Sequence, residues 1–107
     1  MLQDVPTADV VIANPTHFAV VLKYDPEMMS APEIVAKGVD FLALRIIEIA
    51  EKSGVIVTRR PEIARSLYSA LDVGDSIPAE FYQIIAEILA YAYRAKGLDF
   101  KPNKVEL

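Results

Sequence analysis

The sequence predicts an α/β fold: a small mixed central sheet of about four strands packed with helices, in a single domain. The chain has 107 residues, of which 53% are hydrophobic, and this is enough to bury one core. Two runs rich in β-branched residues stand close together near the N-terminus. Segments with apolar residues at helical spacing follow, interrupted by one further β-branched run. Strands and amphipathic helices in this order are typical of a layered α/β arrangement.

The first two predicted strands flank four residues of turn chemistry. Residues 8–13 (ADVVIA) and 18–24 (FAVVLKY) are rich in β-branched and aromatic side chains. Residues 14–17 read Asn-Pro-Thr-His, and Pro15 takes the second position of a turn that Asn14 opens. Type I and type II turns favour proline at that position. We therefore expect a tight turn between two strands.

The next predicted element is a helix over residues 31–52. Ser30 is a suitable N-cap, and Glu33 stands where a capping box places its acidic residue. An apolar series recurs at helical spacing and is expected to face the core: Val35, Val39, Leu42, Ile46 and Ile49. Gly54 is expected to end this helix, because glycine readily adopts the left-handed conformation that closes helices.

The C-terminal half predicts one more strand and two helices. Residues 55–58 form an apolar run suited to a strand covered on both faces. Pro61 and Pro78 open predicted helices at 61–71 and 79–96, because proline is favoured in the first helical turn. Residues 73–77 predict a turn with one short edge strand, and the tail 98–107 is expected to fray. The last helix should direct its apolar face inward: Phe81, Ile84, Ile85, Ile88 and Leu89.

Composition argues against several kinds of site. The chain has no cysteine, which excludes disulfides, thiolate zinc sites and cysteine nucleophiles, and its single histidine argues against a metal site. We expect no cofactor. The net charge of -4 argues against nucleic-acid binding. No uncharged apolar run reaches the roughly 18 residues that a membrane span needs, so we expect a soluble fragment. A conventional hydrolase is not predicted, because no G-x-S-x-G elbow or obvious carboxylate pair is present.

The Asn14–Pro15 bond can break through the chemistry of its own residues. Proline has no backbone N–H, so the usual succinimide route to deamidation is closed. The Asn14 side-chain nitrogen can instead attack the Asn14 backbone carbonyl and release Pro15 as a new amino terminus. Positioning and proton transfer would assist this step. His17 could relay a proton or only hold the loop, and Thr16 could fix the turn. On residues alone, a turn that stays intact is the competing interpretation.

Several segments together resemble one known family. In order, they read NPTHFAVVLKYD, MSAPEIVAKGVDFLALRIIEIA, RPEIARSLY, VGDSIPAEFY and AEILAYAY. They cover nearly the whole chain and resemble the cytoplasmic C-terminal domain of the FlhB family, the export-switch proteins of flagellar and virulence type III secretion systems. The segment KYD…M.AP…AKG, residues 23–38, is similar to the flagellar branch.

The resemblance implies both activity and site. It implies single-turnover self-cleavage between Asn14 and Pro15, supported by Thr16 and His17, and control of export substrate specificity; no enzyme with turnover is implied. Expected partners are flagellar export substrates, other export apparatus proteins and the chain's own cleaved N-terminal piece. A small apolar patch is implied to receive substrates, with helix initiation and core packing as the alternative roles: Ala31, Pro32, Ala86 and Leu89. The alternative function is an uncleaved protein-interaction module.

The resemblance also implies a membrane setting. Family members carry transmembrane helices and a charged linker helix before this domain, so we expect a domain excised from a protein of the bacterial inner membrane, at its cytoplasmic face. A free-standing short homologue is the alternative. Arg59, Arg60 and Arg65 are expected on a solvated edge, with docking to an acidic export component as the other interpretation. Three tyrosines are expected to be half-buried: Tyr82, Tyr91 and Tyr93.

Overall fold

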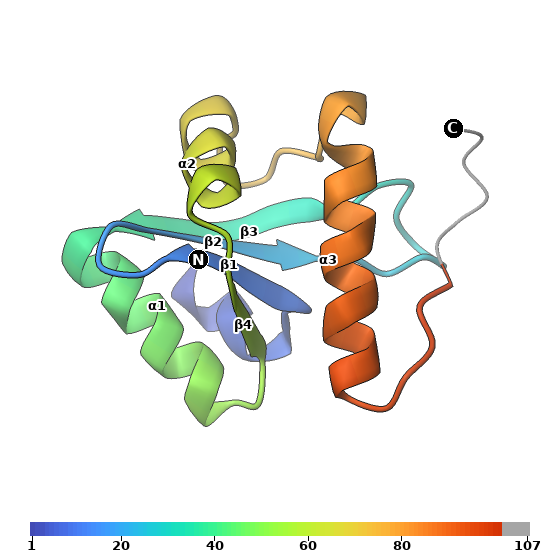
Figure 1. The fold of residues 1–107 in the computed structure, drawn as a ribbon, viewed down its shortest axis with the longest axis horizontal. Coiled ribbons are helices and arrows are strands. Elements are labelled where there is room, and N and C mark those ends of the chain that lie inside the picture. The colour runs from blue at the N-terminus through green and yellow to red at the C-terminus, as the bar shows by residue number, and fades with distance from the viewer. Residues whose placement is uncertain (102–107) are drawn as a thin grey trace.

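A four-stranded mixed sheet separates one helix from two others (Figure 1). The structure is a computed structural model, and it describes residues 1–101. The strands lie in the order β3-β2-β1-β4, with α1 on one face and α2 and α3 on the other. Two short 3-10 segments, η1 and η2, complete the chain. The elements are η1 Leu2–Thr7, β1 Val10–Asn14, β2 Phe18–Lys23, β3 Glu33–Val39, α1 Asp40–Lys52, β4 Ile56–Arg59, α2 Pro61–Ala70, η2 Ala79–Phe81 and α3 Tyr82–Ala95.

The sheet pairs β1 with a strand on each side. β1 runs antiparallel to β2 and parallel to β4, while β2 runs antiparallel to β3. Asn14 is opposite Phe18, so the turn at residues 15–17 closes the β1–β2 hairpin. A single domain with a mixed four-stranded sheet was predicted, and the structure confirms it.

Alternation along the strands divides the buried residues into two clusters. Val10 and Ile12 of β1 face α2 and α3, where they meet side chains such as Leu67 and Leu89. Val11 faces the other way, toward α1 and η1. Both faces of β1 are therefore buried, and its residues from Val10 to Ala13 are 0% exposed. Such continuous burial is typical of an interior strand covered by helices on both faces.

The predicted helix over residues 31–52 is wrong up to residue 39. Glu33–Val39 form strand β3, and α1 begins at Asp40. Within β3 the buried residues alternate as in a strand: Ile34, Ala36 and Gly38. The physical reason is pairing: β3 supplies the outer edge of β2 with a hydrogen-bonded partner, and this tertiary gain overrides local helical spacing.

The capping box is therefore also wrong, whereas the predicted apolar stripe is confirmed only in part: Ile46 is buried, and Val35 and Ile49 pack against the same core. Ser30 precedes the strand, and Glu33 pairs with Lys23 in the sheet. The buried side chains of α1 are Ala43, Ile46 and Ala50, whereas Leu42 is 37% exposed. Gly54 lies just beyond α1 with a φ of +78°, which agrees with its expected role in ending the helix.

Three smaller expectations also need correction. β4 is covered on both faces as expected, since Ile56 and Val57 pack against opposite clusters, but it lies at the sheet edge and its residues are at most half-buried. The short edge strand expected at residues 73–77 is reduced to one isolated bridge between Glu33 and Ser76. The tail does not fray at Phe100, which packs edge-on against Tyr93 with ring centroids 5.2 Å apart. The remainder of the predicted tail, residues 102–107, lies outside the described residues.

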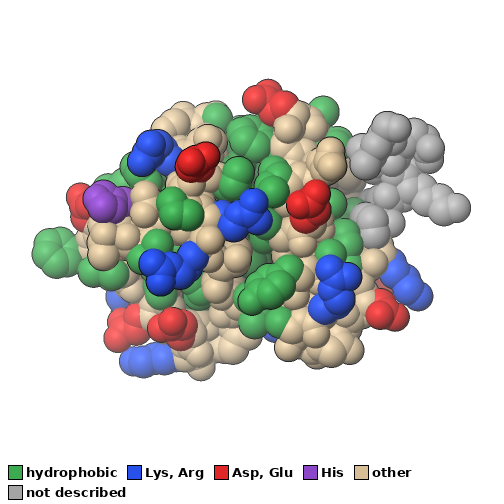
Figure 2. Space-filling view, viewed as in Figure 1, with side chains coloured by type: hydrophobic (Ala, Val, Ile, Leu, Met, Phe, Trp, Pro, Cys, Tyr) green, Lys and Arg blue, Asp and Glu red, His purple; other side chains and the backbone are tan. Residues whose placement is uncertain are grey.

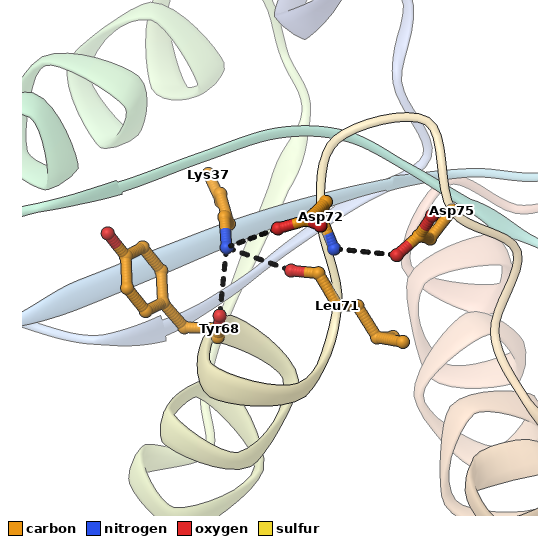
Figure 3. A network of polar contacts seen from close by, with 5 residues as sticks. All are labelled: Lys37, Tyr68, Leu71, Asp72 and Asp75. Atoms are coloured by element: carbon orange, nitrogen blue, oxygen red, sulfur yellow. Dashed lines mark hydrogen bonds and ion pairs between the residues drawn. The ribbon is translucent and has the colours of Figure 1, made fainter.

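A polar cluster joins the outer strand to the end of α2 (Figure 3). The Lys37 ammonium donates to the backbone carbonyls of Tyr68 and Leu71 at 2.9 and 2.8 Å, and it lies 4.3 Å from the centroid of the Tyr68 ring. Asp72 is 3.7 Å from the same ammonium. Lys37 therefore satisfies carbonyls that the end of a helix leaves without intrahelical partners.

Candidate functional site

The Asn-Pro-Thr-His segment forms a tight turn at one end of the sheet. The backbone N–H of His17 donates to the Asn14 carbonyl oxygen at 2.9 Å, which closes a four-residue turn with Pro15 at its second position. Thr16, at the third position, has a φ of 76°. A type II turn requires a positive φ there, and glycine or asparagine usually supplies it. A β-branched threonine in this conformation indicates local backbone strain.

Neighbouring elements hold the turn at both ends through backbone hydrogen bonds. The N–H of Arg60, which follows β4, donates to the Ala13 carbonyl at 3.0 Å. The N–H of Asp40, where α1 begins, donates to the His17 carbonyl at 3.0 Å. Phe18, directly after the turn, packs on Tyr68 of α2 with ring centroids 5.1 Å apart. The Asn14–Pro15 bond therefore lies in a short loop whose two ends are fixed by these contacts.

The side chains of the turn are accessible. Thr16 and His17 are exposed, and Asn14 and Pro15 are half-buried. Figure 2 shows the single histidine of the chain on the surface, at the left of that view. Thr16 Oγ1 and His17 Nδ1 lie 3.1 Å apart, a hydrogen bond whose donor depends on the histidine tautomer. All four predicted residues are thus brought together by the turn.

The arrangement favours attack on the Asn14 carbonyl. An N–H that already donates to this oxygen at 2.9 Å would stabilise negative charge developing on it. The Asn14 side chain starts from the same residue as its target carbonyl, so only its rotamer has to be selected.

The sequence did not predict the two backbone N–H groups, those of Arg60 and Asp40, that hold the ends of the turn. Arg60 and Asp40 act through backbone N–H groups, which carry no residue signature. The one available signal was the type of residue 40, since aspartate tolerates the positive φ of 51° found there. This aspartate could be interpreted only once it was known that β3 ends at Val39.

The four residues of the predicted apolar patch differ in accessibility. Leu89 is 1% exposed and Ala31 is 7% exposed, whereas Pro32 and Ala86 are half-buried. Leu89 belongs to a core cluster that Met29 and Ile34 also contact. The segment around Ala31 and Pro32 and the helix α3 therefore border the same core. Core packing is therefore the observed role of Leu89.

Of the three arginines expected at a solvated edge, Arg59 ends β4, Arg60 follows it and Arg65 lies in α2. Arg59 and Arg65 are exposed, as expected for a solvated edge, and Arg60 lines a shallow hollow beside Thr58, Glu87, Ile88 and Tyr91. Tyr82 and Tyr93 are half-buried as predicted, but Tyr91 is 54% exposed and the expectation for it was wrong. Tyr91 lies on α3 and lines this hollow, which leaves its ring open to solvent.

The described part of the chain holds neither a metal-ligand cluster nor a membrane-spanning helix. No cluster of three or more His, Cys, Asp or Glu side chains in residues 1–101 could hold a metal ion. None of the helices described there is both long and apolar enough to cross a bilayer.

Comparison with known sequences gives one family. The model of the FlhB HrpN YscU SpaS Family matches residues 1–92. The flagellar biosynthetic protein FlhB of Bacillus subtilis is 52% identical over 96 residues, which is 90% of this chain and 27% of that protein. FlhB of Aquifex aeolicus is 50% identical over 105 residues, 98% of this chain and 28% of that protein. The chain thus spans little more than a quarter of these relatives.

Solved structures of the same kind share the fold. The cytoplasmic domain of FlhB from Shewanella putrefaciens aligns with a TM-score of 0.84 at 34% identity, covering 95% of this chain and 84% of that one. An EscU C-terminal domain carrying an asparagine-to-alanine substitution aligns at 0.83 with 30% identity, covering 85% and 91%. In another EscU structure the next residue, a proline, is replaced by alanine.

Proposed function

The chain belongs to the FlhB HrpN YscU SpaS family, and from this premise we propose that it is a cytoplasmic domain that cuts its own backbone between Asn14 and Pro15. The family and its flagellar relatives are components of protein export. In this proposal, cleavage takes place once per chain and sets which substrates the apparatus exports.

The proposed reaction is asparagine cyclisation. The Asn14 side-chain nitrogen attacks the Asn14 carbonyl carbon and loses a proton, forming a five-membered succinimide. The bond from that carbon to the Pro15 nitrogen then breaks, and this nitrogen takes up a proton to become the new amino terminus. Water later opens the succinimide. No water is consumed in the cut itself, which separates this route from hydrolysis by a protease.

One observation carries the proposal: the hydrogen bond from the His17 N–H to the Asn14 carbonyl. At 2.9 Å, the donor already contacts the carbonyl oxygen on which negative charge would develop during the attack. The positive φ of Thr16 supports it, because opening the turn relieves backbone strain. The EscU domains give independent support. In separate EscU structures, an asparagine and the proline that follows it are each replaced by alanine, and these are the residue types of Asn14 and Pro15.

Burial of β1 supports a cut chain that stays assembled. Residues before the cut contribute β1, whose Val10–Ala13 segment is 0% exposed and hydrogen-bonded to both β2 and β4. We therefore propose that cleavage changes the local surface at the turn without releasing the first 14 residues. A change confined to the turn suits a switch that other export proteins detect.

The proposal for substrates and location rests on family membership. We propose that the half-buried Pro32 and Ala86 supply the accessible part of an apolar patch for export substrates, with Ala31 and Leu89 supporting it from the core. We also propose that the complete protein sits in the bacterial inner membrane with this domain on the cytoplasmic side. Substrates and other export apparatus proteins are its proposed partners.

A denaturing gel of the purified chain tests the cleavage proposal. Two bands are expected, corresponding to residues 1–14 and 15–107, and N-terminal sequencing of the larger piece should begin at Pro15. Asn14→Ala removes the nucleophile and should stay whole with an unchanged fold. Cutting of Asn14→Ala at the same bond would indicate a contaminating protease. A parent chain that stays whole would leave the uncleaved interaction module as the function.

A further inference from the structure

Asp40 holds the far side of the turn while also beginning a helix. Its backbone N–H donates to the His17 carbonyl at 3.0 Å. The last partners in the β2–β3 ladder are Phe18 and Val39, so His17 and Asp40 are the next opposed pair. The chain leaves the sheet at this residue and enters α1 directly. Asp40 therefore extends the ladder by one hydrogen bond at the point where the strand ends.

The backbone conformation of Asp40 makes this double role possible. Its φ is 51°, and Thr16 is the other non-glycine residue with a positive φ in residues 1–101. His17 connects the two: it follows Thr16 in the chain and accepts the Asp40 hydrogen bond. The left-handed region is disfavoured for most side chains, least so for glycine, asparagine and aspartate. Residue 40 is therefore restricted to a few types if the bond is to persist.

We propose that Asp40 is a positioning residue for cleavage of the Asn14–Pro15 bond, acting through its left-handed backbone and not through its carboxylate. The inference rests on the proposed self-cleavage. His17 donates its N–H to the Asn14 carbonyl and receives the Asp40 N–H on its own carbonyl. Fixing His17 from the start of α1 thus fixes the N–H group that would stabilise charge on the reacting oxygen. Reaction rates depend steeply on such placement.

Four substitutions of Asp40 separate the effect of its left-handed backbone conformation from the effect of its carboxylate. Asp40→Gly and Asp40→Asn permit the left-handed conformation but lack the carboxylate, so both should cut within about threefold of the parent rate. Asp40→Val disfavours that conformation most, and it should cut at least about tenfold more slowly. Asp40→Ala should fall between them. Rates are read as the cut fraction against time in chain freshly made by cell-free synthesis.

A matched control separates positioning from general loss of stability. Gly54 also has a positive φ, +78°, and no atom lies within 4 Å of a Cβ built there. Gly54→Ala therefore imposes the same kind of backbone strain at the far end of α1, and it should cut at the parent rate. In the uncleavable Asn14→Ala background, hydrogen exchange at the amide of residue 40 should be faster with Asp40→Val than with Asp40→Gly.

The outcomes distinguish the two proposals. A parent chain that never cuts refutes self-cleavage and overturns this inference with it. If the parent cuts, and folded Asp40→Val and Asp40→Ala cut as fast as the parent, then only the positioning role of Asp40 is overturned. If Asp40→Gly and Asp40→Asn cut as slowly as Asp40→Val, then cleavage depends on the Asp40 carboxylate. The backbone account is wrong in that case.

Discussion

Truncation of Ile12 should weaken the hold of the sheet on the first 14 residues once the chain is cut. Ile12 is 0% exposed and lies in the cluster formed with α2 and α3, so Ile12→Ala leaves a cavity in a closed site. Such a change costs about 3 kcal/mol, within the usual range for isoleucine-to-alanine truncations. That loss corresponds to an approximately 100-fold weaker association of the 1–14 piece.

The assay measures exchange of the bound piece. The cut protein is mixed with an excess of fluorescent peptide of residues 1–14, and the rate at which label enters the complex is followed on a native sizing column. Ile12→Ala should exchange much faster than the parent, while Gln3→Ala, at an exposed position of the same piece, should match it. Equal rates for Ile12→Ala and the parent would refute the claim that buried β1 side chains retain the piece.

Three further predictions concern single side chains. His17→Ala keeps the backbone N–H that contacts Asn14 and should slow cleavage without abolishing it; a complete block in a folded variant would make the imidazole essential. Lys37→Met removes the donor to Tyr68 and Leu71 and should lower the free energy of unfolding by about 2 kcal/mol in urea titrations, whereas Lys52→Met, at a site 75% exposed, should change it little. Burial, and then the Asp9 carboxylate, raise the pKa of Tyr93 from its usual 10.0. The resulting stabilisation is complete below the unfolded pKa and lost as pH rises through the folded one, so Tyr93→Phe should make stability fall less steeply above pH 10 in alkaline titrations monitored by circular dichroism.

The turn and its flanking strands could be predicted because their signals are local. Pro15 sets its own φ for the second turn position, and β-branched runs on either side fit a pleated, buried surface. The positive φ of Thr16 could not be predicted, because threonine is among the least suited residues for it. Strain of this kind is imposed by the elements that hold the two ends of the turn.

The start of α1 was missed because two periodicities overlap in the same residues. Val35 and Val39 are four apart, as on a helix face, yet in β3 they alternate with the more buried Ile34, Ala36 and Gly38. Gly38 has a packing role that only the fold explains: a Cβ there would lie 2.5 Å from Leu42 Cγ on the first turn of α1. The contribution of Asp40 followed from this boundary and was missed with it.

Accurate masses of the two pieces immediately after cutting test the central claim most directly. Cyclisation of Asn14 adds no water, so the account predicts that the masses of residues 1–14 and 15–107 sum to the mass of the intact chain. The smaller piece should later gain one water as its succinimide opens, without change in the larger piece. Pieces that together exceed the intact chain by one water from the first time point would contradict asparagine cyclisation and indicate hydrolysis of the Asn14–Pro15 bond.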